Sequence, residues 1–291
     1  MIRFLVNGFN KRVSILAVAL GLGLSGCGSD SDSVPPTGPT PTPSAQTISV
    51  SGGGVKGPLA NAVVTVYAFD STGSGFKGAV VATAVTDSAA AITGLSLPTP
   101  LDPPYIMEFT STPGTTTDIT TGVFPVITTM RTVITQAMLD SGEQIYATPL
   151  TTVATDIAVS NAADTNGTAG IQADEFRAAL TAAASQVVST LGFGMDGAID
   201  IFSTPPLVNS ATVTADEQAD VAAYRTAVEA LTAITYQINS QVTGASVDTV
   251  LADLAADLAD GGVIDGSAGT TLDANTLQVL EQDPATLPIP N

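Results

Sequence analysis

Residues 62–69 read Ala-Val-Val-Thr-Val-Tyr-Ala-Phe, and this stretch decides the fold of the first part of the chain. It is rich in β-branched and aromatic residues, which favour an extended strand. Turn signals flank it, with Gly57-Pro58 before it and Asp70–Gly73 after it. Runs of similar character cover residues 47–55, 79–86, 91–97, 105–112 and 123–133. Short strands at this spacing predict an antiparallel β-sandwich over residues 47–133.

The order of these segments resembles the carboxypeptidase regulatory-like family, a transthyretin-type sandwich. The resemblance is carried by Val55–Tyr67 (VKGPLANAVVTVY), Thr86-Asp87 and Pro104-Tyr105-Ile106. The family commonly has a turn glycine three residues after its Asp, and this chain has Ala90 at that place. The resemblance implies a spacer or binding module that carries no catalytic residues of its own.

The second part of the chain has helical patterns. Thr148-Pro149 is an N-cap followed by a first-turn proline, and Thr214–Glu217 is a capping box. Between them, apolar residues recur at helical spacing along residues 173–191. Ser246 caps a further segment. We therefore predict helices over residues 148–161, 173–191, 214–242 and 246–258. The predicted class is α+β, with the sandwich followed by an Ala-rich helical bundle over residues 134–291.

The N-terminus has the pattern of an export signal. Residues 1–12 contain three basic side chains, and residues 13–24 (VSILAVALGLGL) are apolar. An apolar run of this length is too short to cross a bilayer, which requires roughly 20 residues. It is typical of the central part of a secretory signal.

Leu24, Ser25, Gly26 and Cys27 follow directly and resemble the lipobox of bacterial lipoproteins. The resemblance implies that residues 1–26 are removed and that Cys27 receives acyl lipid, which makes the membrane a partner. Gly28 follows the cysteine, where an Asp would favour retention at the inner membrane in enteric bacteria. We therefore expect a lipid-anchored protein of the outer membrane. The Pro-, Ser- and Thr-rich remainder of residues 27–46 predicts an extended tether.

Charge and composition exclude several functional classes. The chain has 27 acidic and 8 basic residues, and three of the basic residues precede Cys27. Because no acidic residue precedes Cys27, the mature chain has a net charge of −22. Such a surface repels phosphate backbones, so we expect no nucleic-acid partner. There is no histidine and only one cysteine, which excludes Ser-His and Cys-His nucleophile pairs and an internal disulfide.

Residues 164–175 (DTNGTAGIQADE) resemble an EF-hand calcium loop. The resemblance assigns calcium ligands to Asp164, Asn166, Thr168, the carbonyl of Gly170 and Glu175. Two features depart from the motif: Ala169 replaces the sixth-place glycine, and Thr168 brings no charge. We therefore expect a weak site. The alternative is an inter-helix loop in which the Asp-Glu pair caps the next helix, or a decayed EF-hand.

These observations lead to two functional hypotheses. The first is a non-catalytic binding or structural module of the cell envelope, with an envelope protein or polysaccharide as its partner. The alternative is an envelope hydrolase that uses a carboxylate pair, since carboxylates are abundant. We favour the first, because no nucleophile motif accompanies the carboxylates. A closed pocket with two carboxylates of separated pKa values would distinguish the hydrolase.

Overall fold

The predicted central strand is present as β4 (Val63–Phe69), in a computed structural model that describes residues 46–288. Val64 and Val66 are fully buried, whereas Val63 is exposed and Thr65 is half-buried. This alternation is the period-two burial that a strand with one face on the core requires. Antiparallel partners lie on both sides of β4, which is the middle strand of a five-stranded sheet.

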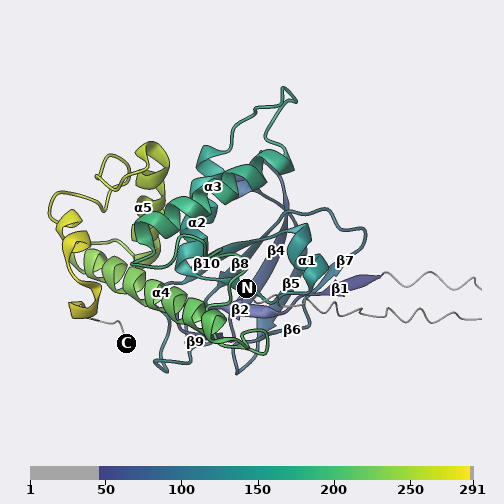
Figure 1. The fold of residues 1–291 in the computed structure, drawn as a ribbon, viewed down its shortest axis with the longest axis horizontal. Coiled ribbons are helices and arrows are strands. Elements are labelled where there is room, and N and C mark those ends of the chain that lie inside the picture. The colour runs from purple at the N-terminus through teal and green to yellow at the C-terminus, as the bar shows by residue number, and fades with distance from the viewer. Residues whose placement is uncertain (1–45, 289–291) are drawn as a thin grey trace, which may run out of the picture. The chain divides into compact units, whose positions relative to one another are not determined.

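The strands form one larger sheet and three short ladders. In the sheet the order is β10 (Thr129–Ile134), β8 (Tyr105–Thr110), β4, β5 (Lys77–Thr86) and β6 (Ile92–Thr93). Two ladders are antiparallel: β1 (Thr47–Ser49) with β7 (Ser96–Pro98), and β3 (Leu59–Ala60) with β9 (Thr117–Asp118). The third is parallel and joins β2 (Gly52–Gly54) to β11 (Ile145–Ala147). Figure 1 shows β4 and β8 near the centre of the sheet.

The α-helices come after the five-stranded sheet in the chain. They are α1 (Gln136–Ser141), α2 (Pro149–Asn161), α3 (Ala173–Leu191), α4 (Ala215–Gln241) and α5 (Val247–Gly261). The predicted caps are confirmed: Thr148 accepts a hydrogen bond from the N–H of Thr151, and Ser246 accepts one from Thr249. Thr214 and Glu217 form the reciprocal capping box. Of the helices within residues 46–288, none is both long and apolar enough to span a membrane.

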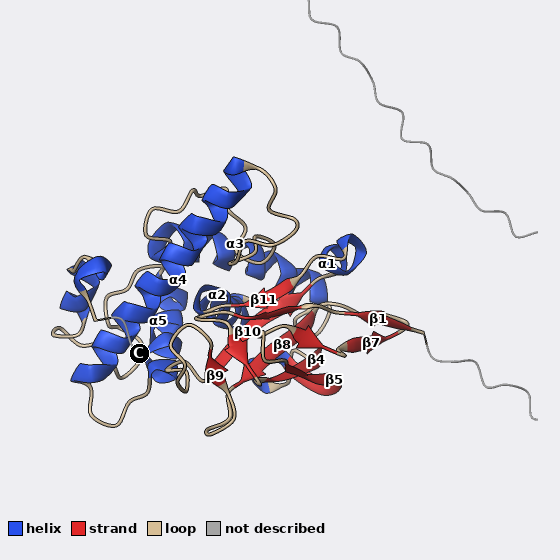
Figure 2. Ribbon diagram, turned by 90° about the horizontal axis from the view of Figure 1, so that it is seen from below, coloured by secondary structure: helices blue, strands red, loops and turns tan. Residues whose placement is uncertain are grey.

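A mixed α and β fold with an antiparallel sheet is confirmed, and the finer prediction of a two-sheet sandwich is not. One reason is that a helix, rather than a second sheet, packs against the five-stranded sheet. Helix α2 lies against β10 and also contacts α3, α4 and α5. Figure 2 shows the helices gathered on one side of the strands, with α2 next to them. The strand expected over residues 123–133 begins only at Thr129.

Helix α2 is buried almost all round, with Leu150, Val153 and Ile157 at most 1% exposed. A helix that is buried on nearly every side lies inside a core rather than on its surface. The hydrophobic core is correspondingly continuous, and it extends from Val50 near the first strand to Leu287 after the last helix. The sheet and the helices of the described residues therefore share one core.

The free edge of β10 is covered by polar side chains of the helices. The backbone N–H of Arg131 donates to Thr152 Oγ1, and its carbonyl accepts from Thr151 Oγ1, at 2.9 and 2.8 Å. Asp248, in the first turn of α5, accepts from the backbone N–H groups of Thr128 and Thr129. An edge strand exposes unpaired N–H and C=O groups, and these bonds satisfy several of them.

Candidate functional site

The proposed lipobox residues Leu24, Ser25 and Gly26 and the proposed lipidation site Cys27 lie outside the described residues. Their roles stay predictions from sequence. The proposed calcium loop is described, and it connects α2 to α3.

Glu175 points back onto the loop that precedes it. One carboxylate oxygen accepts hydrogen bonds from the N–H groups of Thr165 and Asn166, at 2.5 and 2.9 Å, and from the Thr165 hydroxyl. The other accepts from the N–H of Gln172 at 2.9 Å. These donors, the N–H of Gln172 foremost, lower the pKa of Glu175 below its ordinary value. The carboxylate therefore holds the loop against the start of α3.

The other proposed ligands also make hydrogen bonds within the loop. Asp164 accepts from the N–H of Gly167, and Asn166 accepts from the N–H of Thr168. The carbonyl of Gly170 accepts from the side-chain amide of Gln172 at 2.8 Å. In this arrangement a cation would have to compete with several donors for these oxygens.

The left-handed residues of the loop are Gly167 and Gly170, with φ of 77° and 84°. These are the fourth and seventh places, whereas an EF-hand turns at the sixth, which here is Ala169. Within residues 46–288, no group of three or more His, Cys, Asp or Glu side chains is arranged to hold a metal ion. The calcium assignment accordingly stays a prediction.

Other carboxylates of the acidic helical region also bind backbone. Asp257 is fully buried and accepts from the N–H groups of Gly266, Ala268 and Asp265. Burial alone would raise the pKa of Asp257, but these three bonds and one from the Ser267 hydroxyl together outweigh it and lower the pKa. The Asp-Gly turn after α5 is thus fixed by a carboxylate within that helix.

A charged network lies between the sheet and α2. Glu108 accepts from Lys77 at 2.9 Å and from Arg131 at 3.1 Å, and Arg131 also pairs with Asp156. Burial alone would lower the pKa of Arg131, but the Asp156 and Glu108 carboxylates outweigh it and raise that pKa. Burial raises the pKa of Asp156, and Arg131 offsets part of that shift. All four charges have partners, so the network serves to join the helix to the sheet.

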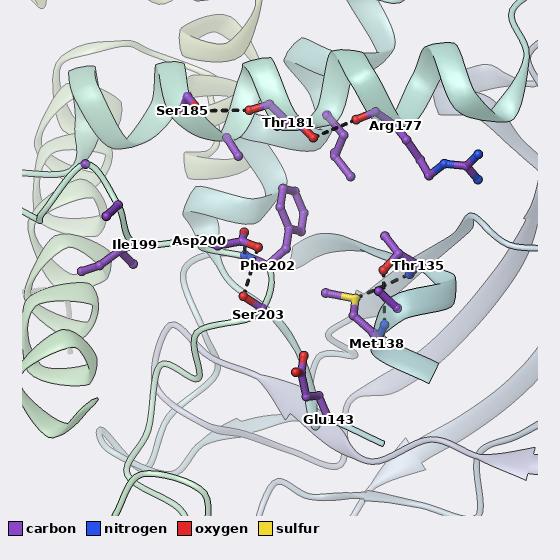
Figure 3. A pocket seen from close by; sticks show the side chains of 15 residues that line it. Thr135, Met138, Glu143, Arg177, Thr181, Ser185, Ile199, Asp200, Phe202 and Ser203 are labelled. Carbon is purple, nitrogen blue, oxygen red and sulfur yellow. Dashed lines mark hydrogen bonds between the residues drawn. The ribbon is translucent and has the colours of Figure 1, made fainter. Parts of the chain in front are cut away.

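The described residues form a pocket of about 590 Å³. Two regions that are far apart in sequence form its walls: α1 with the residues on either side of it, and α3 with the loop that follows it. The lining residues are Thr135, Ala137, Met138 and Glu143; Arg177, Leu180, Thr181, Ala184 and Ser185; and Gly197–Asp200, Phe202 and Ser203. Figure 3 shows these three groups facing a common space.

The floor of this pocket is apolar and its rim is charged. Met138, Leu180 and Phe202 line it and are 5–7% exposed. Arg177 and Glu143 are exposed and come from different walls. Asp200 accepts hydrogen bonds from the N–H of Phe202 and from the Ser203 hydroxyl, both at 3.0 Å. An apolar surface with a few placed polar groups is typical of a small-molecule site.

Sequence reasoning did not find this pocket. Arg177 stands out in the sequence only as one of two basic residues after residue 133. The pocket beside Arg177 forms only where α3 meets α1 and the loop at residues 197–203, and no sequence motif marks either of these segments. No family model matches the chain, and comparisons with curated proteins and with solved structures find no match.

Proposed function

We propose that this chain is an exported lipoprotein, anchored to the outer membrane through lipid on Cys27. Its folded part, residues 46–288, acts as a non-catalytic binding module held off the membrane by the tether. The anchor is supported by the lipobox-like Leu24–Cys27 and the apolar run before it. Two or more acyl chains give stable attachment, because each buried CH₂ contributes about 0.8 kcal/mol.

The observation that carries the binding role is the pocket between α1, α3 and residues 197–203. Its volume of about 590 Å³ falls within the range of roughly 300–1,000 Å³ that is usual for ligand sites. The lining hydroxyls of Thr181 and Ser185 donate to helix carbonyls, those of Arg177 and Thr181. Side chains held in this way suit a binding wall better than nucleophilic attack, which requires an adjacent general base.

The anchor is tested by replacing Cys27 with Ala and following incorporation of labelled palmitate. We expect the wild type to take up label and to sediment with the outer membrane. The variant should take up none and should stall as a precursor or leave the membrane fraction. Unchanged membrane retention of an unlabelled Cys27→Ala protein would refute the lipoprotein assignment.

The binding role is tested in native envelope by placing a photo-reactive amino acid at Ser185, on the pocket rim. The matched control is Thr226, an exposed residue on α4 that does not line this pocket. We expect light-dependent adducts at position 185 and none at position 226. Absence of adducts at 185, or equal labelling at both positions, would contradict a binding role for the pocket.

A further inference from the structure

Arg177 differs from the other basic residues of the described chain. Residues 46–288 contain five basic side chains, and four of them lie within 4.0 Å of a carboxylate. Among residues 46–288, no carboxylate lies within 4.0 Å of the Arg177 guanidinium, although acidic residues far outnumber basic ones. This guanidinium is exposed on the rim of the pocket. A positive charge that stays without a protein partner in so acidic a chain is available to an anionic group of a ligand.

The guanidinium group limits what that anionic group is. Arginine presents a planar fork of N–H donors that matches a carboxylate through two parallel hydrogen bonds. Next to Arg177, Leu180 and Ala184 on the same helix face the pocket, and Phe202 faces it from the following loop. A carboxylate bound at Arg177 would therefore have an apolar body directly beside it.

Negative charges on the other walls argue against a simple anion. Glu143 and Asp200 line the same pocket, and the mature chain has a net charge of −22. This field repels a ligand whose only charge is negative. Within the described residues, the Glu143 carboxylate makes no hydrogen bond or ion pair. It is therefore free to accept from an ammonium group.

We infer that this pocket binds short peptides with apolar side chains and free ends, an inference that rests on the proposed binding role. The peptide's terminal carboxylate pairs with Arg177, its side chains cover Met138, Leu180 and Phe202, and its terminal ammonium faces Glu143. The volume of about 590 Å³ exceeds what a single amino acid fills, which favours two or three residues. A zwitterion brings no net charge into the acidic field.

The test measures calorimetric binding of the tripeptide Leu-Ala-Leu to the full-length chain in detergent. Two modified forms of this peptide serve as matched probes. One has an amidated C-terminus, and the other has an acetylated N-terminus. We expect Arg177→Gln to weaken binding of the free peptide about tenfold, the loss of one charge-assisted interaction. Amidation should weaken wild-type binding by the same factor, and Arg177→Gln should then have no further effect. Glu143→Gln should likewise weaken binding of the free peptide. It should have no further effect on binding of the acetylated peptide, which lacks the terminal ammonium.

Both residues are exposed, so these variants should keep the melting temperature of the wild type. Ser189→Ala, an exposed change on α3 away from the pocket lining, should leave every affinity unchanged. Equal binding of the free and amidated peptides, or no binding at millimolar peptide, would overturn the inference. If the peptide test fails while adducts still form at position 185 in native envelope, the peptide ligand is refuted and the binding module stands. If adducts are absent there too, the proposed function fails with it.

Discussion

Ala90 occupies a backbone conformation that suits glycine. It closes the turn after β5 with φ of 62°, and its N–H donates to the carbonyl of Asp87. The left-handed region costs an L-residue roughly 1–2 kcal/mol, and replacement by glycine removes this strain. The greater flexibility of glycine in the unfolded chain reduces the gain by about 0.5–1 kcal/mol. Ala90→Gly should therefore raise the free energy of unfolding, by up to about 1.5 kcal/mol, in urea denaturation.

Ala89→Gly is the matched control, because Ala89 lies in the same turn, is exposed and has no positive φ. It should lower the free energy of unfolding, since only the entropic cost of glycine remains. If both variants destabilise the protein equally, Ala90 is not strained.

The hydrogen bonds of Glu175 predict a pH-dependent contribution to stability. Because its folded pKa lies below its ordinary value, the ionised form stabilises the fold. This stabilisation is complete above the unfolded pKa, near 4.5, and is lost as the pH falls through the lower folded pKa. Glu175→Gln should therefore lower the melting temperature at pH 7, and the difference should disappear under acidic conditions. Asp174→Asn, one residue earlier and exposed, should show a much smaller difference at pH 7.

Calcium gives a separate test of the same loop. The hydrogen bonds of Glu175 form without a cation, so Glu175→Gln should destabilise the protein even in the presence of a chelator. The sequence hypothesis further predicts that millimolar calcium raises the melting temperature of the wild type, and magnesium less. Equal effects of the two ions, or an undiminished calcium effect in Glu175→Gln, would leave only general screening of the acidic surface.

At the level of elements, Asp248 couples α5 to the edge of the sheet. Its carboxylate accepts from the N–H groups of Thr128 and Thr129 and from the Thr128 hydroxyl, at 2.7–3.1 Å. Asp248→Ala leaves these donors without a partner at a partly buried position. We expect a loss of about 1–3 kcal/mol in the free energy of unfolding.

Asp216→Ala provides the control for this change. Asp216 is also in the first turn of its helix, α4, but it is exposed and its carboxylate makes no hydrogen bond to the sheet. It therefore reports the interaction with the helix dipole alone, about 0.3–1 kcal/mol. A similar loss in both variants would show that the contact with β10 contributes nothing.

At the level of the whole molecule, the shared core predicts cooperative unfolding. A chain that ends at Ile134 lacks β11, the parallel partner of β2, and lacks α2 against β10. It also loses the apolar side chains of α2, each worth about 1.5–3 kcal/mol when fully buried. We expect the full chain to melt in one calorimetric transition and the fragment to show none. Two transitions in the full chain would show that the sheet and the helices unfold independently, which would contradict a shared core.

Local signals in the sequence determined the elements of this protein. Helices α2 and α3 have the predicted bounds because a capping threonine, a first-turn proline and periodic apolar residues act within a few positions of one another. The strand at residues 63–69 is equally local. Helix α1 and β11 were not predicted, since they span only six and three residues. Helix α1 has a capping threonine, Thr135, but it is too short for a periodic apolar pattern.

Only the tertiary structure decided what these elements contact. The β2–β11 pairing joins residues about 90 positions apart, and α2 was placed on the sheet by the match of its buried surface to β10. The pocket brings α1, α3 and residues 197–203 together. The hydrogen bonds from backbone N–H groups to the Glu175 carboxylate depend on how the loop turns at Gly167 and Gly170. The physical reason is range: caps and periodicity act over a single turn of helix or a pair of strand residues, whereas pairing, packing and pockets depend on distant segments whose meeting no local pattern encodes.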